Sequence, residues 1–149
     1  MAIFCQASGF DSLKRKLQAL KTLSTNPRID KALGQGTTKM QAQIKLLTPV
    51  DTGNLRDKIV WSHVKMMEYT IETNVEYAIF VEFGTGRLGD PAVPHTAKPY
   101  WTYYSEKLQH FVRTSGQEPA AMFRTGFELT YKEVFNMVRA EVHAVIRDA

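Results

Sequence analysis

The glycine-rich segment Gly84–Gly89 has the GxGxxG spacing that in nucleotide-binding proteins approaches a pyrophosphate. That chemistry requires a helix to begin at the loop, because the N-terminus of the helix faces the phosphates. Pro91 and Pro94 follow the loop and prevent such a helix, and no lysine stands in the Walker position. We therefore expect no nucleotide cofactor, and we interpret Gly84 and Gly86 as a turn at the end of a strand.

No other residues have the spacing of a catalytic or metal site. Glu76 and Glu82 would lie about 20 Å apart along one strand, too far for the two carboxylates of a glycosidase. Ser105 and Ser115 have no neighbouring base, and Cys5 is the only cysteine. The histidines, at positions 63, 95, 110 and 143, show neither HxxxH nor HxH spacing. We expect no catalytic residue, no metal and no cofactor, so the protein is predicted not to be an enzyme.

Length and composition are typical of one soluble globular domain over residues 1–149, with 44% hydrophobic and 23% charged residues. No apolar run is long enough to span a membrane, no secretion signal is visible, and a single cysteine fits a cytoplasmic protein. We expect residues 1–9 to be flexible. Residues 1–50 carry a net charge of +6 and the remainder −2, which indicates either solvated helix faces or a charge-complementary partner.

The elements that position these residues follow from the hydrophobic periodicity. Apolar residues at steps of three and four predict one helix over residues 10–20 and a second over 27–47. Asn26 before a proline is typical of the start of the second helix, and the glycines at 34 and 36 favour either a kink or a break in it. Beyond residue 50 the pattern changes to the shorter, alternating period of strands.

Strands are predicted over residues 59–64, 69–73 and 77–83, the last apolar enough to be central in a sheet. A helical period then returns over residues 127–145. Because no βαβ alternation is visible, we expect an α+β fold: an antiparallel sheet of three to five strands, two N-terminal helices and a long C-terminal helix. The segment 84–118 is expected to protrude as a long loop carrying a hairpin.

The predicted hairpin pairs residues 100–104 with 108–112 and is rich in aromatic side chains. With the nearby Lys98, Lys107 and Arg113, these rings could stack single-stranded bases. Alternatively, the aromatics occupy both faces of the hairpin, one packed inward and one against a neighbouring subunit. We favour the second hypothesis because few basic residues lie between the rings. The interface candidates are Tyr100, Trp101, Tyr103 and Tyr104.

Two short motifs stand on either side of the predicted sheet. The Asp51 carboxylate is expected to accept backbone N–H groups just beyond it, which would make residues 51–56 a capped turn. The second motif combines the end of the predicted third strand with the glycine loop. The turn motif comprises Asp51, Thr52, Gly53, Leu55 and Arg56, and the strand–loop motif comprises Tyr77, Glu82, Gly84, Thr85 and Gly86.

In this order and spacing, PVDTGNLR followed by YAxxVExGTG resembles the neck or tail-completion proteins of long-tailed bacteriophages, often labelled minor tail components. The resemblance extends over roughly residues 10–145. One departure is the segment 121–126, Ala-Met-Phe-Arg-Thr-Gly, where the family usually has Pro-Phe-Met/Leu-Arg-Pro-Ala before the last helix.

The resemblance implies a structural virion protein that joins the head to the tail without catalysis. Its implied partners are further copies of itself in a ring, for which a hexamer is one candidate, the head connector, and the tail terminator or tail tube proteins. DNA would pass through the channel without specific binding, and no membrane would be involved. The implied location is the neck or tail of the virion, with the host cytoplasm during assembly.

The rival hypothesis is a small nucleic-acid-binding module that uses the basic N-terminal helices and the aromatic hairpin. Salt-dependent retention on DNA would favour it, because phosphate contacts release counterions. A hydrolase is a third hypothesis, supported only by unpaired titratable residues.

Overall fold

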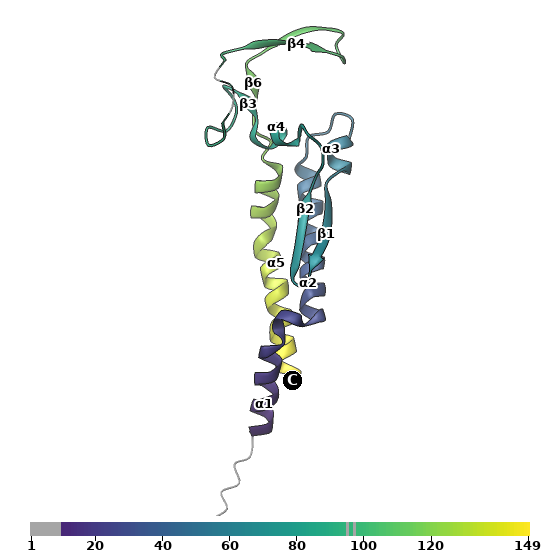
Figure 1. Ribbon diagram of the computed structural model, residues 1–149, viewed down its shortest axis with the longest axis vertical. Coiled ribbons are helices and arrows are strands. Elements are labelled where there is room, and N and C mark those ends of the chain that lie inside the picture. Colours follow the sequence, from purple (N-terminus) through teal and green to yellow (C-terminus); the bar gives the residue numbers. More distant parts are fainter. Residues whose placement is uncertain (1–9, 95, 97) are drawn as a thin grey trace, which may run out of the picture. The chain divides into compact units, whose positions relative to one another are not determined.

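The computed structural model describes residues 10–94, 96 and 98–149 (Figure 1). The flexibility expected for residues 1–9 lies outside the described residues. The chain forms two compact units, each described separately below. The helical unit contains the described residues up to 40, with 61–71 and 130–149, and the motif unit contains residues 41–60 and 72–129.

The fold is α+β, with two N-terminal helices and a long C-terminal helix, as expected. The helices are α1 (Phe10–Lys21), the 3-10 helix η1 (Leu23–Thr25), α2 (Pro27–Leu47), α3 (Asn54–Asp57), α4 (Ala78–Phe83) and α5 (Met122–Arg147). The strands are β1 (Val60–Lys65), β2 (Glu68–Glu72), β3 (Thr85–Gly86), β4 (Trp101–Ser105), β5 (His110–Thr114) and β6 (Gly116–Gln117).

The strands do not form the single sheet of three to five strands that the sequence predicts. Among the described residues they form three two-stranded sheets, β1–β2, β3–β6 and β4–β5. Two of the three join neighbouring segments of the chain, and the predicted hairpin is confirmed as β4–β5, with Trp101 opposite Thr114 and Ser105 opposite His110. The physical reason is that the segment expected to be the central strand is helical, so nothing joins these pairs into one sheet.

That segment, residues 77–83, forms the helix α4. A short apolar run does not distinguish a buried strand from a helix by periodicity alone. Burial in the structure has the helical spacing: Ala78 and Glu82, four residues apart, are buried, whereas Phe80, which a strand would place on the same face as both, is exposed. The prediction of a third strand was therefore wrong.

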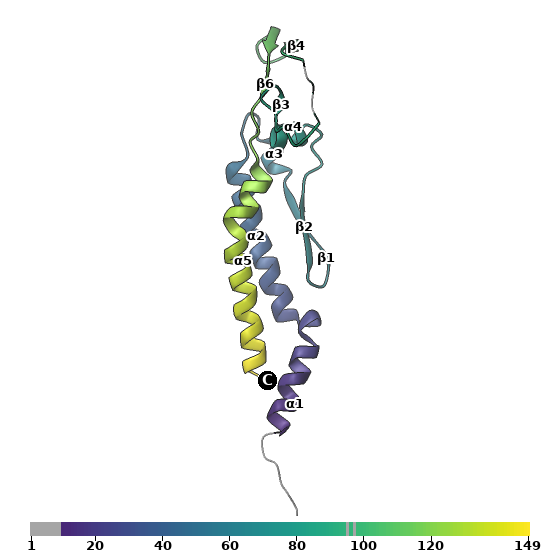
Figure 2. The same ribbon diagram turned by 90° about the vertical axis from the view of Figure 1, so that its left-hand side faces the viewer.

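In the helical unit, α2 begins as the sequence predicts. The Asn26 side chain accepts a hydrogen bond from the Arg28 backbone N–H at 2.9 Å, which satisfies one of the donors left free at a helix start. The helix continues without a break at its two glycines (Figures 1 and 2). A Cβ on Gly36 would overlap the Val134 side chain, so this glycine lets α5 approach α2 closely.

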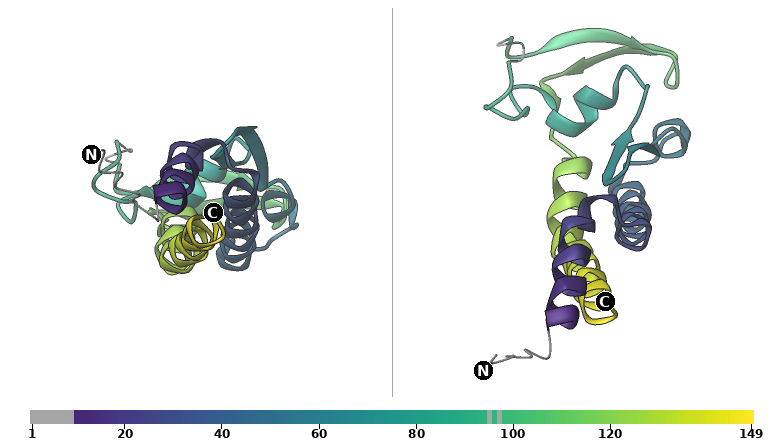
Figure 3. Two further views of the ribbon diagram at one scale, coloured as in Figure 1. Left: turned by 90° about the horizontal axis from the view of Figure 1, so that it is seen from below. Right: turned by 60° about the horizontal axis from the view of Figure 1, so that its bottom comes forward.

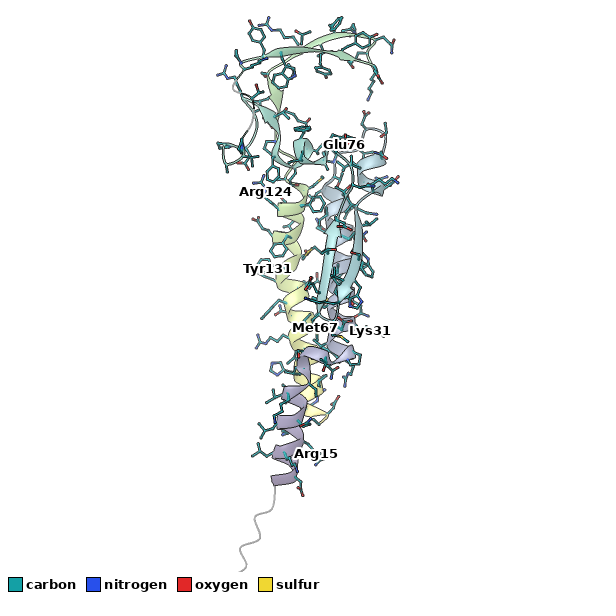
Figure 4. The ribbon with its side chains drawn as sticks, viewed as in Figure 1. Arg15, Lys31, Met67, Glu76, Arg124 and Tyr131 are labelled. Carbon is teal, nitrogen blue, oxygen red and sulfur yellow. The ribbon has the colours of Figure 1, made fainter. Side chains whose placement is uncertain are left out.

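The hairpin β1–β2 is held against α2 by the carboxylate of Asp30. One oxygen accepts the Met67 backbone N–H at 2.7 Å, and the other accepts the Tyr69 hydroxyl at 3.2 Å. Met67 lies at the tip of the hairpin, beside the first turns of α2 (Figure 4). The Met67 N–H and then the Tyr69 hydroxyl hold the pKa of Asp30 below its ordinary value, against the opposing effect of burial. The neighbouring His63 stacks on the Tyr69 ring at 4.6 Å.

The motif unit has its own small core. The Gln41 side chain donates a hydrogen bond to the Ile59 carbonyl at 2.9 Å and so connects the second half of α2 to the chain leaving α3. Gly126 of α5 lies against α2, because a Cβ there would be 2.5 Å from Cγ1 of Ile44. The buried apolar residues of this unit are Ile44, Leu55, Ile59, Ala78 and Met122.

Candidate functional site

The turn motif and the strand–loop motif meet in the motif unit. Leu55 of α3 is buried, and the amide of the adjacent Asn54 donates a hydrogen bond to the Tyr77 hydroxyl at 3.4 Å. Beside this contact lies a hollow of about 620 Å³, which is lined by residues 49–55, Tyr77, Val81 and Gln117. The turn motif and the strand–loop motif, which 20 residues of chain separate, therefore pack together, and we call this contact region the joint.

The capping role expected for Asp51 is wrong. Its carboxylate pairs with the Lys107 ammonium of the hairpin turn, and both side chains are largely exposed. Inside the turn the side-chain acceptor is Thr52, whose hydroxyl accepts the Asn54 N–H at 3.4 Å. The residue before α3 is Gly53, in the left-handed conformation with φ 85°, so the backbone itself makes the bend without the Asp51 side chain. Arg56, the last residue of the turn motif, lies 3.9 Å from the Asp57 carboxylate.

Glu82 of the strand–loop motif caps the helix α5. Its side chain is only 8% exposed, and its two oxygens accept the backbone N–H groups of Phe123 and Arg124 at 2.9 and 3.2 Å. These N–H groups have no acceptor within the helix, because they lie in the first turn of α5. A negative charge at this position also interacts favourably with the positive end of the helix dipole. The buried carboxylate is thus a structural group that fixes where α5 begins, at Met122 instead of near the expected residue 127.

The glycines of the loop permit a close approach of β3 to β6. Gly84 and Gly86 have positive φ values of 72° and 62°, and Thr85 pairs with Gln117 while Gly86 pairs with Gly116. A Cβ on Gly84 or on Gly116 would overlap backbone oxygen atoms of the opposite strand. The GxGxxG spacing therefore serves a backbone turn, as the sequence suggests, although the turn leaves a helix and not a strand.

Arg124 ties this loop to the start of α5. Its guanidinium pairs with the Asp90 carboxylate, lies 3.4 Å from Glu82, and stands over the Phe83 ring at 5.1 Å. Hydrogen bonding to Asp90 is the main reason that the pKa of Arg124 lies above its ordinary value. The Asp90 backbone N–H also donates to the Phe83 carbonyl at 2.8 Å, so the loop closes on α4. Figure 4 shows Arg124 at the beginning of α5.

The two glutamates that the sequence separated by about 20 Å instead line one hollow. Because residues 77–83 are helical, Glu76 and Glu82 both border a space of about 440 Å³. The Glu82 oxygens, however, are occupied by the N–H groups of α5. Among the described residues, no group of three or more His, Cys, Asp or Glu side chains is placed to hold a metal ion.

The β4–β5 ribbon presents aromatic side chains on both faces, as expected. Trp101 and Tyr103 lie on one face, and Tyr104 and its cross-strand partner Phe111 lie on the other, where their rings meet edge to face at 5.3 Å. In the described part of the chain no third strand pairs with the ribbon (Figure 3). The exposed fractions are 48% for Tyr104 and 71% for Phe111.

The sequence interpretation did not single out Phe111, although alternation along the second hairpin strand could have indicated that it faces Tyr104. The guanidinium of Arg113 lies 3.4 Å from the centre of the Tyr100 ring, and Lys107 is paired with Asp51. Two of the three basic groups proposed for base stacking are thus already engaged within the chain.

Trp101 differs from the other interface candidates. It is half-buried, and its ring lies against the backbone at Gly86, where an added Cβ would be 2.7 Å from Cζ3 of the indole. Beside it is an apolar cavity of about 380 Å³ between α4, β3 and the following loop. We name this the Trp101 hollow; its apolar lining includes Ile79, Phe80, Phe83, Val93, Pro94 and Trp101.

Residues 11–84 match the family model described as "Bacteriophage HK97-gp10, putative tail-component". The matched residues extend from α1 to the end of α4 and contain the complete turn motif. This match agrees with the resemblance to phage neck and tail proteins drawn from the sequence motifs, and the matched family is described as a tail component. No curated protein and no solved structure gives a significant match to the chain. None of the helices in the described ranges combines the length and apolarity needed to cross a membrane.

Proposed function

We propose that the protein is a structural subunit of the head–tail junction, which assembles with copies of itself into a ring and joins the head connector to the tail. Two motifs of the proposed family form the joint between α3, α4 and α5, and the family match extends across both N-terminal helices. In this role the chain needs a rigid joint and exposed contact surfaces instead of a catalytic centre.

The observation that carries this proposal is the exposure of the β4–β5 ribbon. An isolated two-stranded ribbon is marginally stable in water, and contiguous exposed apolar side chains mark sites of protein–protein contact. Here Tyr103 and Tyr104 are each 48% exposed, on opposite faces of the ribbon. A neighbouring subunit that covers these rings would supply the burial that the chain itself does not, as buried aromatics commonly do at interfaces.

Complementation of a phage that lacks this gene tests the proposal. Supplying the Tyr103→Ser/Tyr104→Ser double variant should leave the protein folded but yield unjoined heads and tails in electron micrographs. The matched control, Leu129→Ser, removes an exposed apolar side chain from α5 and should restore joined particles. Normal joining by the double variant, or a gene deletion that leaves joining intact, would contradict the proposal. Salt-sensitive retention of the purified protein on DNA would instead favour the nucleic-acid-binding module.

A further inference from the structure

We infer that the Trp101 hollow of one copy receives the Tyr104–Phe111 pair of a second copy. This inference rests on the proposed ring assembly and specifies the contact from which such a ring would be built. The occupant is a hairpin of the same chain, and the recognition is apolar and aromatic.

The hollow fits this occupant in chemistry and size. Its walls come from apolar side chains of α4, the loop after β3 and Trp101, and Phe80 at its wall is 56% exposed. A volume of about 380 Å³ lies within the range of cavities that bind organic groups. Because Tyr104 and Phe111 are only 48% and 71% exposed, inserting both side chains would remove about 200–300 Å² from water. That is roughly a quarter to a third of the 800 Å² that each partner buries in a stable interface.

The pair cannot fill the hollow of its own chain. Trp101 borders the hollow, and Tyr104 follows it by three residues along β4, which corresponds to about 10 Å. Because three is an odd number of steps, the Tyr104 and Phe111 side chains project from the face of the ribbon opposite to Trp101. The face that carries the pair therefore points away from the hollow within one chain.

The separation of the two surfaces also determines the kind of assembly. When one copy inserts a projecting pair into a hollow elsewhere on the next copy, the contact is heterologous, with different patches on the two partners. Heterologous contacts generate rings if the rotation closes, whereas a self-complementary patch generates a closed dimer. The motif unit alone presents both halves of the contact, so each added copy offers a new hollow or a new pair.

Crosslinking in assembled particles tests the contact. In a Cys5→Ser background, two single-cysteine chains, Phe111→Cys and Phe80→Cys, are co-assembled with cysteine-free copies that keep particle formation independent of the variants. A short bismaleimide should give a crosslinked dimer only when both chains are present. Val93→Cys lies on the same hollow and should also give a crosslinked dimer with Phe111→Cys. Leu129→Cys lies on the exposed side of α5 and should give none.

The outcomes separate this inference from the proposed function. Particles that contain the protein but give no crosslink at either hollow position would overturn the inference and leave the structural role intact. A dimer from Phe111→Cys alone would also overturn it, because it would show a self-complementary contact. Absence of the protein from purified particles would overturn the proposed function and, with it, this contact.

Discussion

The Glu82 carboxylate on α4 accepts the backbone N–H of Phe123 at 2.9 Å, so the side chain of one short helix caps the start of the longest helix in the chain. The same segment is fixed through its backbone, since the Ala121 N–H donates to the Glu82 carbonyl at 3.1 Å. Through this contact the strand–loop motif determines where α5 begins, although 39 residues of chain separate Glu82 from Met122.

Replacing Glu82 by alanine should lower the free energy of unfolding by about 1–3 kcal/mol, because two N–H groups lose a buried charged acceptor. Glu82→Gln keeps one acceptor oxygen and should cost less. Urea denaturation measures both, as a lower midpoint at unchanged slope. The matched control is Glu76→Ala on the exposed rim of the same hollow, where we expect a change within about 0.5 kcal/mol. Equal effects at the two positions would show that the cap contributes nothing.

Two glycines with positive φ should differ sharply in their tolerance of alanine. In Gly53→Ala the new Cβ makes an ordinary van der Waals contact with Asp57 Oδ2 at 3.7 Å, so the change should cost only the left-handed backbone strain of about 1–2 kcal/mol. Gly116→Ala, with φ 124°, would also drive a Cβ into the Thr85 carbonyl. It should lower the free energy of unfolding by more than about 3 kcal/mol, which is the scale of severe packing defects. Thermal melts of both variants would test this order, and a reversed order would refute the β3–β6 approach.

Asp30→Asn should make the free energy of unfolding less dependent on pH in the acidic range. Hydrogen bonds from the Met67 N–H and the Tyr69 hydroxyl lower the pKa of Asp30 in the folded protein, so its contribution is complete above the unfolded value of about 3.9. That contribution is lost as the pH falls through the lower folded value. The variant should therefore be less stable than wild type at pH 6, with the gap narrowing below about pH 4. Urea midpoints from pH 7 to pH 2.5 measure this gap, and a gap that stays constant over the whole range would contradict the role of Asp30.

Asp51→Ala should change the free energy of unfolding by no more than about 0.5 kcal/mol, because an exposed ion pair with Lys107 contributes little. A double-mutant cycle with Lys107→Ala should give a coupling of similar size. Elevated salt should abolish that coupling. A loss near 2 kcal/mol would instead restore the capping role that the sequence suggested.

Trp101 and Tyr104 should respond differently to alanine although they share a strand. Trp101→Ala uncovers the backbone at Gly86 and part of the hollow wall, and should cost about 1–3 kcal/mol in the isolated protein. Tyr104→Ala removes a half-exposed ring and should leave the melting temperature nearly unchanged while impairing assembly. Circular dichroism melts, read beside particle counts, separate the two roles, and equal destabilisation by both would contradict the assignment.

Sequence periodicity by itself determined the elements whose apolar pattern is long or whose partner is nearby. The stripes of α1, α2 and α5, the Asn26 cap and the β4–β5 hairpin all follow from contacts between residues close in the chain. The two motifs likewise indicated the resemblance to phage tail proteins, because their residue types are required locally for a left-handed turn and a tight glycine approach.

Tertiary structure decided what the short apolar run 77–83 became and what its polar residue does. Six residues carry too little periodicity to separate a strand from a helix, and packing against distant segments selects between them. Glu82 became a cap because α5, which begins after 39 intervening residues, brings orphan N–H groups to it. Asp51 pairs with Lys107 for the same reason. The partner of a charged side chain depends on which distant segments the fold brings together, and the local spacing of residues does not predict this.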